Sequence, residues 1–119
     1  MSQNTYRQTA EAPTLQGITA CPGEADAHCV VLREYSPDFP PGHILVAEFT
    51  DPSFMPNIAV AAGVIVERDG ILSHAAIVTR ELGIPCIVGV REATKRLRSG
   101  DRVHLDANGG KIHVLCRNK

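Results

Sequence analysis

The stretch from Gly63 to Val90, GVIVERDGILSHAAIVTRELGIPCIVGV, contains the pattern that decides the fold. Residues 63–66 and 84–90 are short runs of apolar, mostly β-branched side chains, which predict two strands buried on both faces. The segment between them has the length and composition of a loop followed by a helix. Two buried strands joined by a helix are typical of a parallel crossover unit, so we expect an α/β fold.

The helix of this unit has a start signal and a stop signal. Ser73 can cap the helix because its hydroxyl accepts a hydrogen bond from a backbone amide one turn further along. Residues 74–82 then predict the helix itself, and Gly83 can end it in a left-handed conformation. His74 therefore lies in the first helical turn, just beyond the C-terminal end of a predicted parallel strand. This edge of an open α/β sheet commonly carries the functional site.

The position of His74 suggests a chemical role. We expect the first-turn amides of Ala75, Ala76 and Ile77 to lack intrahelical acceptors and to form an anion site at the positive end of the helix dipole. A neutral imidazole above such a site could accept a phosphoryl group, with the amides and the Ser73 hydroxyl holding its oxygens. The alternative interpretation is a polar surface residue or a second capping group.

Residues 69–89, DGILSHAAIVTRELGIPCIVG, resemble the signature of a known family. They are similar to the phosphohistidine swivelling, or mobile, domain of phosphoenolpyruvate-utilising enzymes, such as pyruvate phosphate dikinase, phosphoenolpyruvate synthase, enzyme I and rifampin phosphotransferase. Residues 17–25, 41–52 and 100–112 resemble other segments of that domain, so the similarity covers about residues 15–115. The resemblance implies that His74 is the phosphorylated residue. It places Gly70, Ser73, Ala75 and Ala76 around the phosphoryl group.

The sequence departs from the family pattern most clearly at Asp69, which stands where the family usually has the first of two glycines. A carboxylate beside a phosphoryl site would repel the anion, unless it points away or helps to hold Mg²⁺. Arg80 matches an arginine of the family pattern. Its place six residues beyond His74 favours a structural ion pair, with an acidic residue of the C-terminal hairpin, over a phosphate clamp.

The remaining chain predicts one domain, over residues 15–119, preceded by a disordered tail over residues 1–14. Alternating apolar residues at 102–106 and 111–116, around a glycine-rich turn, predict a closing antiparallel hairpin. We expect a mostly parallel central sheet with helices on one side and a second small β layer. The three-layer β/β/α arrangement is what the resemblance implies.

Composition narrows the possible functions of the 119-residue chain. The net charge of −1 indicates no basic face, so nucleic acid is not an expected partner. No apolar run could span a bilayer and no signal-peptide pattern is present, so no membrane association and a cytoplasmic location are the default expectations. The four cysteines form no Cys-x-x-Cys pair, which favours reduced, buried thiols over disulfides or a zinc site.

Three functions fit these observations. The first is a freestanding phosphoryl carrier in which His74 receives the group from a partner's ATP- or phosphoenolpyruvate-binding site and passes it to an acceptor. No Walker-type loop is present, so nucleotide, Mg²⁺ and substrate are expected on a separate nucleotide-binding or phosphoenolpyruvate/pyruvate-binding domain or subunit, and no tightly bound cofactor or metal on this chain. The second is a non-catalytic regulatory or assembly module. The third is a split subunit or fragment of a larger phosphotransferase.

Overall fold

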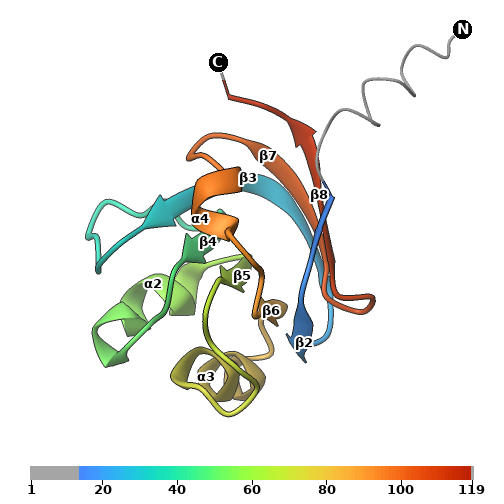
Figure 1. Cartoon of the computed structure of the whole chain (residues 1–119). Coiled ribbons are helices and arrows are strands. Elements are labelled where there is room, and N and C mark those ends of the chain that lie inside the picture. The colour runs from blue at the N-terminus through green and yellow to red at the C-terminus, as the bar shows by residue number, and fades with distance from the viewer. Residues whose placement is uncertain (1–13, 119) are drawn as a thin grey trace, which may run out of the picture.

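The computed structural model describes residues 14–118, which form eight strands and several short helices (Figure 1). The strands are β1 (Thr14–Gln16), β2 (Ile18–Cys21), β3 (Glu24–Leu32), β4 (Ile44–Ala47), β5 (Gly63–Val66), β6 (Cys86–Val88), β7 (Arg102–Asp106) and β8 (Lys111–Cys116). The helices are the 3-10 turn η1 (Pro52–Phe54), α2 (Met55–Val60), α3 (His74–Leu82) and α4 (Ala93–Arg96).

All eight strands belong to one mixed sheet with the order β1-β8-β7-β3-β4-β5-β6-β2. The long strand β3 joins its two parts. Residues 24–28 of β3 pair antiparallel with β7, whereas residues 29–32 pair parallel with β4. Strand β3 therefore connects the antiparallel hairpin β7–β8 to the parallel part of the sheet (Figure 1).

The expectation of a mostly parallel sheet is wrong. Over residues 14–118 the pairs β3–β4, β4–β5 and β5–β6 are parallel, whereas four pairs, β1–β8, β2–β6, β3–β7 and β7–β8, are antiparallel. The crossover unit was correctly predicted to be parallel, because a helix joins β5 to β6. The antiparallel pairs are the consecutive hairpin strands β7 and β8 and three pairs, β1–β8, β2–β6 and β3–β7, that join segments remote in sequence.

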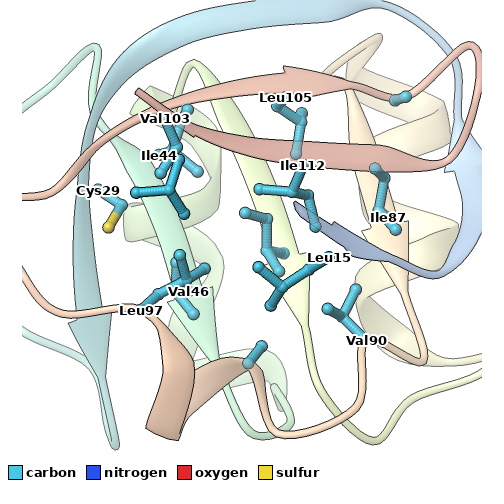
Figure 2. Packing of buried hydrophobic residues seen from close by; sticks show 14 residues of the cluster. Leu15, Cys29, Ile44, Val46, Ile87, Val90, Leu97, Val103, Leu105 and Ile112 are labelled. Atoms are coloured by element: carbon cyan, nitrogen blue, oxygen red, sulfur yellow. The ribbon is translucent and has the colours of Figure 1, made fainter. Parts of the chain in front are cut away.

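The alternation of side chains along the central strands divides the core between the two faces of the sheet. Ile65 of β5 belongs to one buried cluster with Leu105 of β7 and Ile112 of β8. Figure 2 shows Leu105 and Ile112 side by side within this cluster. Its neighbours Val64 and Val66 pack into the other cluster, with residues of α2 and α3. Strands buried on both faces explain why these runs are continuously apolar. The helices α2 and α3 cover one face, and the hairpin β7–β8 covers the other (Figure 1).

Local sequence signals agree closely with the structure around α3. Strand β5 and helix α3 have the predicted bounds, and Gly83 ends the helix in the left-handed region at φ 72° and ψ 33°. The hairpin strands also match, whereas the second strand is shorter than predicted and spans only Cys86–Val88. Most of the predicted N-terminal tail lies outside the described residues; Thr14, its last member, belongs to β1.

Candidate functional site

The candidate site lies on the loop from Glu67 to Ser73, which leaves the C-terminal end of β5 and enters α3. Ser73 has extended backbone angles, φ −77° and ψ 170°, and its hydroxyl accepts a hydrogen bond from the Ala76 amide at 3.4 Å. The Ser73 carbonyl accepts from the Ile77 amide at 3.0 Å. This geometry confirms Ser73 as the N-cap, and His74 is the first residue of the helix.

As a whole residue, His74 is only partly buried. Its Nδ1 atom lies 3.0 Å from the hydroxyl oxygen of Thr50, a buried residue three positions after the end of β4. Among the described residues, no hydrogen bond is found at the other ring nitrogen, Nε2. Thr50 was assigned no site role from the sequence. Its position just beyond a neighbouring parallel strand, at the same edge of the sheet, is the signal that could have found it.

The first-turn amides differ in part from the expectation. Ile77 is already satisfied by the Ser73 carbonyl, because the regular helical ladder begins with this bond. Ala76 donates to the Ser73 hydroxyl. Ala75, among the residues that the structure describes, has no backbone or side-chain acceptor for its amide. Of the three first-turn amides expected to be free, only that of Ala75 is therefore without an acceptor among the described residues. Gly70 lies nearby on the exposed loop, with open space where a side chain would be.

Asp69 lies against this site. Within the described part of the chain its Oδ2 atom is buried and has no hydrogen-bond partner. Burial raises the pKa of Asp69 above its ordinary value, although the Thr50 amide, the Ser73 hydroxyl and nearby His74 act in the opposite direction. Over residues 14–118, no three His, Cys, Asp or Glu side chains gather as metal ligands.

Arg80 supports the loop that precedes His74. Its guanidinium donates to the backbone carbonyls of Ile71, at 2.9 Å, and Ala20, at 3.3 Å. The structural role expected for Arg80 agrees with these contacts, but the predicted partner, an acidic residue of the hairpin, is wrong. The arginine instead connects the end of β2 to the loop that carries the site.

Comparison with known proteins assigns the family. The model of the family described as PEP-utilising enzyme, mobile domain matches residues 39–110, which include His74 and Thr50. The chain therefore belongs to the family of PEP-utilising enzyme mobile domains, where PEP stands for phosphoenolpyruvate. In the described residues 14–118, none of the helices is long and apolar enough to cross a membrane.

The similar proteins are much longer than this chain. A protein named uncharacterized phosphotransferase YvkC, from Bacillus subtilis, is 43% identical over 86% of the chain, and phosphoenolpyruvate synthase from Pyrococcus furiosus is 42% identical over 83%. The chain spans 12% of the length of each. A solution structure of enzyme I (nEIt) is 29% identical, with a TM-score of 0.56, and the match covers 65% of this chain and 32% of that one. The domain thus recurs as one part of larger proteins.

Proposed function

We propose that this domain is a phosphoryl carrier in which Nε2 of His74 is transiently phosphorylated. The observation that carries the proposal is the pair formed by the partly buried residue His74 and the Thr50 hydroxyl, 3.0 Å from Nδ1, at the start of a capped helix. A fully buried ring with the same hydrogen bond could not reach a phosphoryl donor on another domain or subunit. Similarity to phosphotransferases and to phosphoenolpyruvate synthase supports this reaction class.

Thr50 determines which form of the ring can react. A nucleophilic Nε2 needs a free electron pair, so the proton of the neutral ring must lie on Nδ1. Nδ1–H then donates to the Thr50 hydroxyl oxygen, which holds the ring in this tautomer and orientation. In the transfer step the Nε2 pair forms a bond to phosphorus, and the bond from phosphorus to the donor's leaving oxygen breaks. The reverse displacement by an acceptor oxygen restores the neutral ring.

The surrounding groups supply a place for the phosphoryl oxygens. Ala75 is a buried residue of the first turn, where the helix dipole favours an anion, and its amide has no acceptor among the described residues. Ser73 can donate its hydroxyl hydrogen while its oxygen still caps the Ala76 amide. Gly70 leaves room for the group, since a Cβ there would meet no atom within 4 Å. Of the four residues expected from the sequence, we assign Ala75, Ser73 and Gly70 to direct phosphoryl binding, and Ala76 supports them by donating its amide to the Ser73 hydroxyl.

A partner completes the reaction in this proposal. Nucleotide or phosphoenolpyruvate, together with Mg²⁺, would be bound by a separate domain or subunit, and His74 would move between the donor and acceptor sites. We also propose that the domain has the three-layer β/β/α arrangement, which is supported by α2 and α3 over one face of the sheet and the β7–β8 hairpin over the other. A regulatory module is the second candidate, favoured by the carboxylate of Asp69 beside the site.

The test is transfer of labelled phosphate to the domain. The protein is incubated with a nucleotide-binding or phosphoenolpyruvate-binding partner from the same source and with labelled ATP or phosphoenolpyruvate. We expect label that is labile in acid and stable in base, as for a phosphorylated imidazole. His74→Gln should lose all of this label. His43→Gln, which changes a histidine in the bend just before β4, should keep it.

Two results would contradict the carrier proposal. Label that survives in folded His74→Gln would place the phosphoryl group on another residue. A partner that binds the wild-type domain tightly but never phosphorylates it, with either donor, would favour the regulatory module instead.

A further inference from the structure

Two cysteines outside the phosphoryl site face each other at one margin of the sheet. Cys21 ends the edge strand β2, and Cys86 begins β6, its antiparallel neighbour. The register pairs them directly, and both belong to the buried cluster that α3 covers. Directly opposed residues of an antiparallel pair point to the same face of the sheet, so the two thiols share one environment.

An irregularity in β2 produces this pairing. Thr19 is opposite Ile87, so a regular antiparallel ladder would place Ala20 opposite Cys86. The register shifts between Thr19 and Cys21, and Cys21 takes that position instead. Opposed residues in antiparallel strands have Cα atoms about 4.5–5.5 Å apart. This separation lies within the range of about 4.4–6.8 Å that disulfides span.

The two thiols differ in access. Cys86 is fully buried, and burial raises the pKa of its thiol to about 12, so on its own it is a poor nucleophile. Cys21 retains 7% of its exposure and lies at the end of an edge strand, where local opening is easiest. An oxidant from solvent would therefore react first with the Cys21 thiol.

We propose that Cys21 and Cys86 close a reversible cross-strand disulfide when the protein meets a small hydroperoxide, such as hydrogen peroxide. The Cys21 thiolate attacks one peroxide oxygen, the O–O bond breaks, and the departing hydroxide takes a proton to become water. The Cys86 sulfur then attacks the Cys21 sulfenic acid, the S–O bond breaks, and water leaves with the Cys86 proton. Overall, two thiols and one peroxide give one disulfide and two waters.

The test uses the full chain with the other two cysteines replaced, Cys29→Ser together with Cys116→Ser. After peroxide treatment under native conditions, alkylation should find no free thiol, and peptide mapping should find the segments containing residues 21 and 86 linked. Dithiothreitol should restore both thiols. Because the link closes a long loop, the melting temperature should rise by roughly 5 °C or more.

The matched control keeps the other pair of cysteines. In Cys21→Ser with Cys86→Ser, Cys116 of β8 and Cys29 of β3 remain, separated by strand β7. Two strand spacings, about 9–10 Å, are too far for a disulfide, so no internal link should form. If a variant fails to fold, peptide mapping of the oxidised wild type still shows whether Cys21 and Cys86 are linked. The proposal is overturned if the Cys21 and Cys86 thiols stay free, or if they oxidise separately to sulfinic acids.

Discussion

At the scale of single residues, the site depends on a hydroxyl that holds the histidine ring. Thr50 and His74 are 24 positions apart in the chain, and their contact involves only one of the two ring nitrogens, Nδ1. A carrier needs this distinction because only one nitrogen can be the nucleophile at a time. Control of the tautomer is therefore the most direct link between a residue of this fold and its proposed chemistry.

Replacement of Thr50 tests that link. Thr50→Val keeps the shape of the side chain and removes the hydroxyl, so the ring loses its Nδ1 partner. We expect the rate of His74 phosphorylation to fall about 10- to 100-fold, the usual effect of removing such a supporting group. Thr50→Ser is the matched control and should retain most of the rate. Equal rates in both variants would show that the hydroxyl does not orient the ring.

Asp69 gives a pH-dependent prediction. Burial raises its pKa above the ordinary value of 3.8, so the folded protein holds this proton more tightly than the unfolded chain. The corresponding stabilisation is present at low pH and is lost as the pH rises from 3.8 through the raised pKa. Asp69→Asn cannot titrate. The melting temperature of this variant, relative to wild type, should therefore increase across that window and then level off. A difference that does not change with pH would contradict the raised pKa.

At the scale of elements, helix α3 is set by its two ends. Ser73 caps the first turn, and Gly83 supplies the left-handed residue that ends the last one. Thr79, in the middle, donates its hydroxyl back to the Ala75 carbonyl at 2.7 Å, which fixes its side chain within the helix. Both helix ends could be predicted because capping depends on residues only a few positions apart.

The helix end can be tested without disturbing the core. A Cβ at Gly83 would meet no atom within 4 Å, so the penalty of Gly83→Ala comes from its φ of 72° alone. We expect a loss of about 1 kcal/mol in the free energy of unfolding, measured with urea. Gly70→Ala is the control, because that position is equally open and its φ is not positive. The free energy of unfolding of Gly70→Ala should differ from that of the wild type by less than about 0.5 kcal/mol.

At the scale of the whole molecule, the two parts of the sheet are held together by a shared core. Leu105 of β7 is fully buried and reaches across to β5: a Cβ built on Gly63 would lie 2.8 Å from its Cδ2 atom. The hairpin thus packs on the same strand that leads to the site. Loss of this contact should affect the stability of the entire domain.

We therefore expect Leu105→Ala to lower the free energy of unfolding by about 3 kcal/mol, because it removes buried methyl groups and leaves a cavity. The same change at Leu72, whose exposed fraction is 83%, should alter stability by less than about 0.5 kcal/mol. Urea denaturation of both variants makes the comparison. Similar losses at the two positions would show that the hairpin does not share the core of the parallel part.

The sequence by itself determined the crossover unit. Strand β5, helix α3, its caps and the place of His74 in the first turn all follow from residue types at short, regular spacings, as does the hairpin of β7 and β8. Such signals depend on backbone preference and on periodic burial within one segment. They can be read without knowledge of what the segment packs against.

Only the tertiary structure decided which distant segments meet. Four features join parts of the chain that no local pattern connects. They are the two-sided pairing of β3, the antiparallel pairs other than the β7–β8 hairpin, the Thr50 contact with His74 and the carbonyl partners of Arg80. The physical reason is that strand pairing and long side-chain contacts are selected by burial in a common core. That selection acts on the whole folded chain at once.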